Sequence, residues 1–279
     1  MTRLSIGLVS RRVEALAQVD EWGAGAVAVA VLRGRDVIAA RGPCDQEFRW
    51  ASITKPAVAL ATLVAAEEGV VDLDEPAGPE GSTVRHLLAH ASGFPFHGDK
   101  PIARPGTRRI YSNTGFEQLA AHVERAAEMP FPEYLREAVF APLGMGAELR
   151  GSAGADVYGT LDDLVALARE LQSPTLVAAE TLAEMTSVHF PGLNGVLPDV
   201  GRFDPNDWGL GVELRDAKQP HWTGTRNSEQ TFGHFGGSGT FLWVDPAVGL
   251  ALACLTDREF DSWALEAWPR LSDGVLEEA

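Results

Sequence analysis

Residues 52–66 read SITKPAVALATLVAA, an apolar run that begins with a serine and a lysine three positions apart. Apolar side chains on every face are typical of a helix that is buried on all sides. Pro56 falls in the first turn, where its missing N–H is harmless, and Gly69 follows where a helix commonly ends. The stretch therefore predicts a core helix that carries Ser52 and Lys55 on one face of its first turn.

Strand patterns lie on both sides of this helix along the chain. The amino-terminal part has an amphipathic helix pattern at residues 10–22, then two strand patterns at 24–32 and 37–40 joined by a turn. The carboxyl-terminal part has three strand patterns and a final helix, at residues 209–214, 239–244, 250–255 and 262–278. Between the two parts the chain is mainly helical, with helix patterns at residues 84–90, 116–127, 132–139 and 161–171 and a long loop at 190–208.

This arrangement indicates an α+β fold. We expect one antiparallel β-sheet assembled from both ends of the chain and flanked by the amino- and carboxyl-terminal helices. Residues 1–69 and 208–279 would form the sheet domain, and residues 70–207 an inserted, mainly helical domain.

The charge balance narrows the set of partners. Among 279 residues there are 23 Lys and Arg against 39 Asp and Glu, a formal net charge of -16. Such a chain repels phosphate backbones and anionic lipids, so neither nucleic acid nor a membrane is expected as a partner. Cys44 and Cys254 do not make a disulfide framework in a chain of this length. The apolar stretch before Arg11 is too short for a signal-peptide core, so a cytoplasmic location is expected.

The pair Ser52 and Lys55 is the first candidate for chemistry. A serine hydroxyl is a weak nucleophile and needs a base beside it. A lysine placed in an apolar helix tends to lose its proton or to find a hydrogen-bond partner. The alternative is a helix-capping serine followed by a surface lysine. The apolar surroundings of the pair disfavour that alternative.

The second candidate is Tyr111-Ser-Asn113, which follows a Pro-Gly turn. A phenol beside a lysine ammonium has its anionic form favoured, and it can then shuttle a proton. The Asn113 amide can hold the lysine and offer a donor to a substrate carbonyl. The alternative is a tyrosine next to an asparagine that caps the following helix.

The third candidate is the glycine-rich segment Gly233-His-Phe-Gly-Gly-Ser-Gly239. Clustered glycines beside a strand let a ligand approach the backbone closely. A backbone N–H in this segment would form half of an oxyanion hole, with the N–H of Ser52 as the other half. The alternative is a mobile turn in which His234 is exposed.

In this order the three motifs resemble the serine β-lactamase and penicillin-binding protein superfamily, in its class C-like branch with a Tyr-x-Asn second motif. The resemblance extends over about residues 26–257. It includes three framing segments, LLAHASG at 87–93, PLGM at 142–145 and WGLG at 208–211.

The resemblance implies a serine hydrolase that forms an acyl-enzyme with a small-molecule acyl substrate and uses neither a metal nor a cofactor. It implies these roles: Ser52 as acylated nucleophile, Lys55 as its hydrogen-bonded partner, Tyr111 as proton shuttle, Asn113 as ligand of substrate and lysine, His234 and Gly236 as the third motif, and the N–H groups of Ser52 and Gly237 as the oxyanion hole. A glutamate deacylation base of the class A type is not implied.

The third motif departs from the Lys-Thr-Gly of many relatives. His234 is mostly neutral at pH 7, and Phe235 offers no hydrogen bond. Loss of a charged anchor disfavours substrates that carry a carboxylate, such as β-lactams. We therefore expect an intracellular esterase or amidase for small neutral acyl substrates. The alternatives are a β-lactamase or D-alanyl-D-alanine carboxypeptidase, and a catalytically silent ligand-binding relative.

Two other patterns are weaker. His86 and His90 are four residues apart, as in a zinc helix, but no glutamate lies between them to act as base. Ser238 follows glycines as in a nucleophile elbow, but Thr240 stands at the last glycine position and the serine precedes a strand. Neither a zinc site nor an α/β-hydrolase is expected, and no pattern indicates the oligomeric state.

Overall fold

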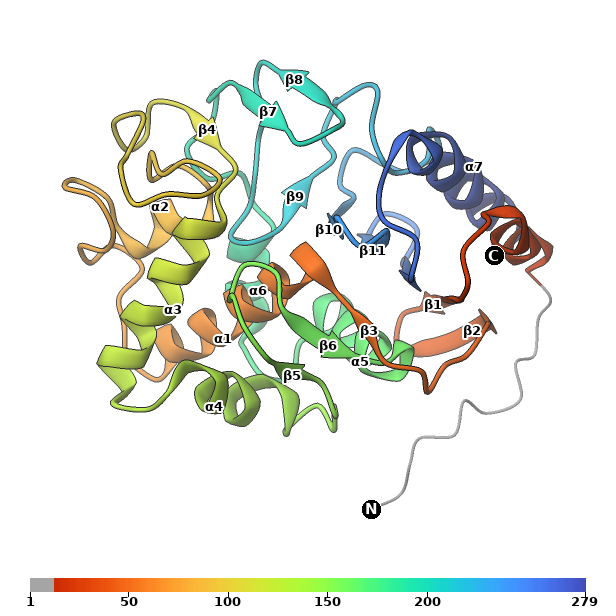
Figure 1. Cartoon of the computed structure of the whole chain (residues 1–279), viewed down its shortest axis with the longest axis horizontal. Helices are drawn as coiled ribbons and strands as arrows, with labels where there is room; N and C mark the ends of the chain where they lie inside the picture. Colours follow the sequence, from red (N-terminus) through yellow and green to blue (C-terminus); the bar gives the residue numbers. More distant parts are fainter. Residues whose placement is uncertain (1–12) are drawn as a thin grey trace.

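The structure, a computed structural model, describes residues 13–279. Its centre is a six-stranded antiparallel sheet with the strand order β2-β1-β12-β11-β10-β9 (Figure 1). The strands are β1 (Val27–Arg33), β2 (Asp36–Arg41), β9 (Glu213–Leu214), β10 (Phe232–Gly236), β11 (Thr240–Asp245) and β12 (Leu250–Thr256). Strands from both ends of the chain share this sheet, which confirms the predicted α+β class.

Helices cover both faces of the sheet. Side chains alternate along a strand, so Val29 and Val31 of β1 face one side and Ala28 and Ala30 the other. The first side packs against α7 (Ser262–Glu278) and the 3-10 helix η1 (Glu14–Glu21). The second side packs against α5 (Leu161–Gln172). Strands covered on both faces are buried almost throughout, which explains their continuous apolar sequences.

A second group of helices lies beside the sheet and centres on α1 (Thr54–Glu67), which follows the short 3-10 helix η2 (Ala51–Ile53) (Figure 1). Residues 54–65 of α1 are all buried, as their apolar sequence predicts. Around α1 lie α2 (Val84–Leu88), α3 (Asn113–Ala127), α4 (Phe131–Leu135), the π-helical turn η3 (Arg136–Phe140) and α6 (Ala179–Met185).

Two small sheets complete the fold. One has the order β3-β6-β5, and the other β4-β7-β8. Their strands are β3 (Phe48–Arg49), β4 (Arg109–Ile110), β5 (Glu148–Leu149), β6 (Val157–Gly159), β7 (Gly195–Leu197) and β8 (Gly201–Phe203). Strand β3 of the first sheet leads directly into the segment that carries Ser52. Strand β4 of the second sheet ends just before Tyr111.

Several sequence predictions require correction. Residues 190–208 are not one long loop, because β7 and β8 form there by pairing with each other and with β4. The strand expected at 209–214 is limited to Glu213–Leu214. The helix expected at 10–22 is a 3-10 helix at Glu14–Glu21, and residues 10–12 lie outside the described part of the chain.

The sequence patterns also missed a strand at residues 233–236, which belong to β10 and not to the mobile turn given as the alternative. The glycine at position 233 permits close strand packing, since a Cβ there would lie 2.0 Å from the carbonyl oxygen of Leu242. Local pattern rules assign such glycines to turns because they do not include the neighbouring strand.

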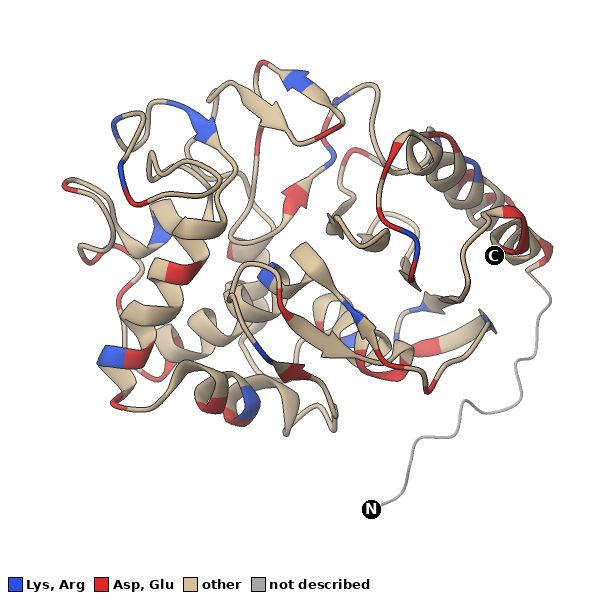
Figure 2. Ribbon diagram, in the orientation of Figure 1, with Lys and Arg blue, Asp and Glu red and all other residues tan. Residues whose placement is uncertain are grey.

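Charged residues lie mainly on the outer helices and loops, while the central strands are almost free of them (Figure 2). In the described part of the chain, no helix is both long and apolar enough to cross a membrane. The domain boundaries at 69/70 and 207/208 stay a prediction. Helix α5, from the interval 70–207, packs on the sheet.

Candidate active site

Lys55 is the most deeply placed polar residue of the site. It lies in the first turn of α1 and is fully buried, which excludes the surface-lysine alternative. Its Nζ lies 2.6 Å from Asn113 Oδ1, 2.7 Å from the carbonyl oxygen of Gly154 and 3.2 Å from Ser52 Oγ. Burial holds the pKa of Lys55 well below its ordinary value, and the charge of Glu117 acts in the opposite direction.

These contacts orient the amine in either protonation state. A neutral lysine has two N–H groups and one lone pair, and the oxygens of Asn113 and Gly154 can only accept hydrogen bonds. They therefore take the two N–H groups of Lys55 at the two shorter distances. In the neutral form this leaves the lone pair toward Ser52 Oγ, the position that a general base requires, whereas the ammonium form donates its third N–H to Ser52 Oγ.

Ser52 is half-buried and follows a left-handed residue. Ala51 has φ +47°, a conformation that disfavours residues with a Cβ. The surrounding contacts hold it there: Trp50 is fully buried, its N–H donates to the carbonyl of Val157 at 2.9 Å, and its own carbonyl accepts from Thr240 Oγ1 at 2.8 Å. Ile53 occupies the position that caps α1, so Ser52 is not the helix cap.

Tyr111 lies between β4 and α3 in an aromatic surrounding. Its ring centre is 4.5 Å from Lys55 Nζ, 4.5 Å from the His90 ring and 5.7 Å from the Trp208 ring. Burial raises the pKa of the Tyr111 phenol above its ordinary value, and the Ser52 hydroxyl opposes this only in part. The expectation that the anionic form is favoured is therefore wrong, and the phenol is a proton donor at neutral pH.

His234 is the partner of that phenol. It is buried on β10, which rules out the exposed-turn alternative. Its Nδ1 lies 2.7 Å from the carbonyl of Phe235 and must donate to it, so Nε2 is the acceptor for the Tyr111 hydroxyl at 3.3 Å. Burial lowers the pKa of His234 to about 3. His234 therefore acts at neutral pH as a hydrogen-bond acceptor without charge.

Asn113, Gly236 and Gly237 also meet at this site. Asn113 is the first residue of α3, and Ser112, not Asn113, caps the helix through a 2.9 Å bond from the N–H of Gly115. A Cβ on Gly236 would lie 2.6 Å from the carbonyl oxygen of Trp50, so the glycine lets β10 pass close to the serine segment. Gly237 follows with open space where a Cβ would project.

A cavity of about 280 Å³ opens in front of Ser52. Its lining includes every predicted site residue except the buried Lys55 and the strand residue Gly236. The other lining residues are Arg49, Ala51, Phe96, His97, Ala155, Leu197, Pro198, Asp199, Phe235 and Phe260. Among these described residues the one with a permanent positive charge is Arg49, and it is paired with Asp156 at 2.8 Å.

The sequence patterns missed two groups that the site uses. The carbonyl of Gly154 comes from a loop between β5 and β6, and a backbone acceptor leaves no side-chain signal. His90 was identified only within the framing segment at 87–93 and in the disfavoured zinc pattern with His86. Its carbonyl accepts from the N–H of Ile110 at 2.9 Å and its Nδ1 from the N–H of Ser112 at 3.2 Å, so it holds the backbone on both sides of Tyr111.

Comparisons with known proteins find relatives that match most of the chain. The model of a protein family described as Beta-lactamase matches residues 14–147 and 146–274. A solved structure of a beta-lactamase from Mycobacterium bovis is 53% identical, covers 95% of this chain and 98% of that chain, and has a TM-score of 0.93.

Two further relatives are more distant. Esterase EstB from Burkholderia gladioli is 25% identical over 360 residues, which covers 90% of this chain and 90% of the esterase. A penicillin-binding protein from Bacillus subtilis (strain 168) is 28% identical over 131 residues. That match covers 35% of this chain and 29% of the relative, so it spans less than a third of that protein.

Proposed function

The chain belongs to the beta-lactamase family of hydrolases, and from this premise we propose that it cleaves an ester or amide through an acyl-enzyme on Ser52. The observation that carries the proposal is the Lys55 amine, which is fully buried and lies within hydrogen-bond distance of Ser52 Oγ, Asn113 Oδ1 and the Gly154 carbonyl oxygen. A binding protein without catalysis has no need to bury a lysine in this way, because the burial of an ionisable group is unfavourable unless it is neutral or paired.

The first half-reaction follows from this geometry. Ser52 Oγ attacks the carbonyl carbon of the substrate while its proton passes to Lys55 Nζ. The C–O or C–N bond to the leaving group then breaks, and the leaving alcohol or amine departs with a proton supplied through the Tyr111 phenol. The products are the acylated Ser52 and the neutral leaving group.

Tyr111 is placed for that proton transfer because its ring centre lies 4.5 Å from Lys55 Nζ and it lines the cavity together with Ser52. The neutral His234 can receive the hydroxyl hydrogen bond in the resting state without adding charge to a buried site. The N–H groups of Ser52 and Gly237 would stabilise the oxyanion, since both residues line the cavity.

The second half-reaction reverses these roles. A water molecule loses a proton to the Tyr111–Lys55 pair and attacks the acyl carbon, and Ser52 Oγ departs with a proton. The acid product is released and the hydroxyl of Ser52 is restored. The net reaction consumes one water molecule per acyl bond.

The cavity favours small neutral acyl groups. Its walls include the aromatic and aliphatic side chains of Phe96, Leu197, Phe235 and Phe260. The lining cation Arg49 is already paired with Asp156. A substrate carboxylate would therefore find no unpaired permanent cation among the described lining residues. The esterase activity named for the Burkholderia gladioli relative supports this choice.

The second candidate is β-lactam hydrolysis, which the name of the Mycobacterium bovis relative favours at 53% identity. Ester cleavage and β-lactam opening share the acyl-enzyme on Ser52, so they differ in which acyl group fits and in how fast the acyl-enzyme reacts with water. A chromogenic cephalosporin assayed beside a chromogenic ester separates the two by their kcat/KM values.

A single variant tests the acyl-enzyme. We expect wild-type protein to hydrolyse 4-nitrophenyl acetate and to show, by intact mass, an adduct with a slowly hydrolysed acylating agent such as a penicillin. Ser52→Ala should lower the rate at least about 1000-fold and abolish the adduct, because the nucleophile is absent. Unchanged thermal unfolding of Ser52→Ala is the control for folding. Hydrolysis by Ser52→Ala at the wild-type rate would refute the proposal.

A further inference from the structure

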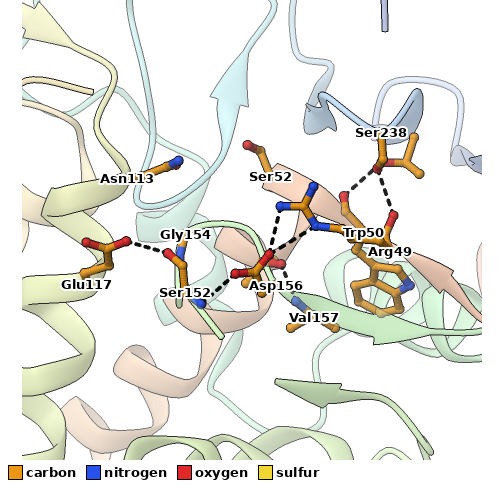
Figure 3. A network of polar contacts seen from close by, with 12 residues as sticks. Arg49, Trp50, Ser52, Asn113, Glu117, Ser152, Gly154, Asp156, Val157 and Ser238 are labelled. Atoms are coloured by element: carbon orange, nitrogen blue, oxygen red, sulfur yellow. Dashed lines mark hydrogen bonds and ion pairs between the residues drawn. The ribbon is translucent and has the colours of Figure 1, made fainter. Parts of the chain in front are cut away.

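A chain of four polar side chains connects the segments that contact the Lys55 amine (Figure 3). The four residues, called here the polar strap, are Arg49, Asp156, Ser152 and Glu117. They come from β3, from the loop between β5 and β6, and from α3. None of these positions carried a signal in the sequence motifs.

The first link starts at the serine segment. Arg49 lies three residues before Ser52, and its Nε and Nη2 donate to Asp156 Oδ1 at 3.1 and 2.8 Å. The carbonyl of Arg49 accepts from Ser238 Oγ at 2.8 Å, which fixes the backbone of this residue to the sheet side of the site. Asp156 is thereby tied to the segment that carries the nucleophile.

The second link closes the loop around Gly154. Asp156 Oδ2 accepts from the N–H of Ser152 at 2.8 Å, and Ser152 Oγ accepts from the N–H of Gly154 at 3.1 Å. The carbonyl of Gly154 then meets Lys55 Nζ at 2.7 Å. A Cβ on Gly154 would lie 3.0 Å from Asn113 Oδ1, so a glycine here lets the loop approach the site closely.

The third link reaches the helix of Asn113. Ser152 Oγ donates to Glu117 Oε1 at 2.6 Å, and Glu117 lies one turn after Asn113 on α3. The Ser152 hydroxyl thus accepts from the Gly154 backbone and donates to α3 at the same time. The three segments that carry Ser52, Asn113 and Gly154 are thus connected by contacts outside the buried amine.

We propose that the polar strap holds the Gly154 carbonyl on Lys55 Nζ and so keeps the amine lone pair directed at the Ser52 hydroxyl. The inference rests on the proposed function. Arg49, Asp156, Ser152 and Glu117 are positioning residues, which act through Gly154 and Asn113 on the base. Without the carbonyl of Gly154, one N–H of the amine has no fixed acceptor, and rotation of the amine moves the lone pair away from the nucleophile.

Glu117 has a second, separable effect through its charge. The charged or titratable groups that face Lys55 from the surrounding elements are Glu117 on α3, Tyr111 before α3, His90 after α2 and His234 on β10. Of these, Glu117 raises the pKa of Lys55 against the larger lowering by burial. Removal of its charge should therefore lower the pKa of the base and extend the neutral amine to lower pH.

Two variants separate position from charge. Ser152→Ala breaks the strap, and we expect it to lower the acylation rate constant for 4-nitrophenyl acetate about tenfold, with little change in substrate affinity. Glu117→Gln keeps an acceptor for the Ser152 hydroxyl but has no charge. We expect its maximal rate to stay within about threefold of wild type and the acid limb of its kcat/KM profile to shift to lower pH, because that limb reports the pKa of the free base.

Glu47→Gln is the matched control. It removes one partner of the exposed Glu47–Arg150 ion pair, in which two hydrogen bonds of 2.7 Å join the side chains. Both residues are close to strap residues in the sequence, but neither belongs to the polar strap. We expect its acylation rate and pH profile to equal those of wild type. Thermal unfolding of each variant checks the fold, and the isosteric Glu117→Gln provides a test even where Ser152→Ala does not fold.

The outcomes are distinct. Wild-type acylation rates in both Ser152→Ala and Asp156→Ala, with Ser52→Ala inactive, would overturn the strap and leave the proposed function intact. An unshifted acid limb in Glu117→Gln together with a rate loss equal to that of Ser152→Ala would also overturn it. Activity in Ser52→Ala would overturn the proposed function instead.

Discussion

Lys55 shows how burial changes the chemistry of one side chain. An exposed lysine is an ammonium ion at neutral pH and has no lone pair to offer. In the fully buried first turn of α1 the charged form loses its hydration, and the pKa falls well below the ordinary value. The oxygens of Asn113 and Gly154 each accept a hydrogen bond from the amine and so fix its orientation.

The backbone carbonyl and the ring of His90 both accept hydrogen bonds from the segment that carries Tyr111. His90 has a left-handed backbone with φ +54° and accepts from the N–H groups of residues 110 and 112. Burial lowers the pKa of its ring far below the ordinary value. A protonated ring has no acceptor, so Nδ1 can receive the N–H of Ser112 only from the neutral form. His90 therefore fixes the position of Tyr111 between its two contacts.

A pair of substitutions tests this role. His90→Asn keeps an oxygen near the place of Nδ1 and tolerates the left-handed backbone, whereas His90→Gln extends its amide past that position and tolerates it less. We expect kcat of His90→Gln to be about tenfold below that of His90→Asn, with similar KM, because Tyr111 is displaced without loss of the cavity. Steady-state kinetics with 4-nitrophenyl acetate measures the difference, and equal kcat values would contradict the role.

At the level of elements, the site depends on how closely β10 passes the serine segment. The carbonyl of Trp50 accepts from Thr240 Oγ1, and that of Arg49 from Ser238 Oγ, so the turn after β10 is fastened to the residues before Ser52. Gly236 lies at the closest approach, where a Cβ would also meet Thr240 Oγ1 at 2.7 Å.

Two neighbouring glycines give opposite expectations. Gly236→Ala should lower the free energy of unfolding by about 1–3 kcal/mol, because the added methyl group overlaps backbone atoms that cannot move aside. Gly237→Ala adds its Cβ to open space and should stay within about 0.5 kcal/mol of wild type. Urea denaturation measures the free energy of unfolding of both variants. Equal values would contradict the prediction, because they would show that β10 shifts to accommodate a methyl group at position 236.

At the level of the whole molecule, buried neutral histidines make the fold sensitive to acid. In the unfolded chain His234 binds a proton near pH 6.5, whereas in the folded chain it does so near pH 3. The unfolded state therefore binds more protons between these values, and stability is lost as the pH falls from 6.5 toward 3. His90 contributes with the same sign because its pKa is also lowered.

The expected change in the free energy of unfolding with pH is large enough to measure. The His234 shift alone predicts a loss of about 2 kcal/mol in the free energy of unfolding between pH 7.5 and pH 5. His234→Asn removes this titration, so its loss over the same interval should be smaller by about that amount. Urea denaturation at the two pH values gives the comparison. A pH dependence identical in wild type and variant would show that His234 does not titrate as described.

The cytoplasmic location stays a prediction of the sequence, which cell fractionation tests. The roles of the predicted site residues are likewise proposals until the variants are measured. Their proximity is a property of the fold: Ser52, Tyr111, Asn113, His234 and Gly237 line one cavity although they are up to 185 residues apart.

The sequence by itself determined the elements whose signal is local. An all-apolar run with an early proline specifies the buried helix α1, and continuous or alternating apolar residues specify β1, β11 and β12. Motif spacing predicted that Ser52 and Lys55 lie close together, although Ser52 belongs to η2, just before α1. Their order relative to Tyr111 and His234 indicated the family.

Only the tertiary structure decided which groups surround the base. The Gly154 carbonyl, the polar strap and the clamp by His90 arise from segments that meet through packing, and backbone acceptors have no residue type to reveal them. The same holds for β7, which pairs with the distant β4, and for β10, which passes close to the Trp50 carbonyl at Gly236. The protonation states of Lys55, Tyr111 and His234 follow from burial, which the local sequence does not measure.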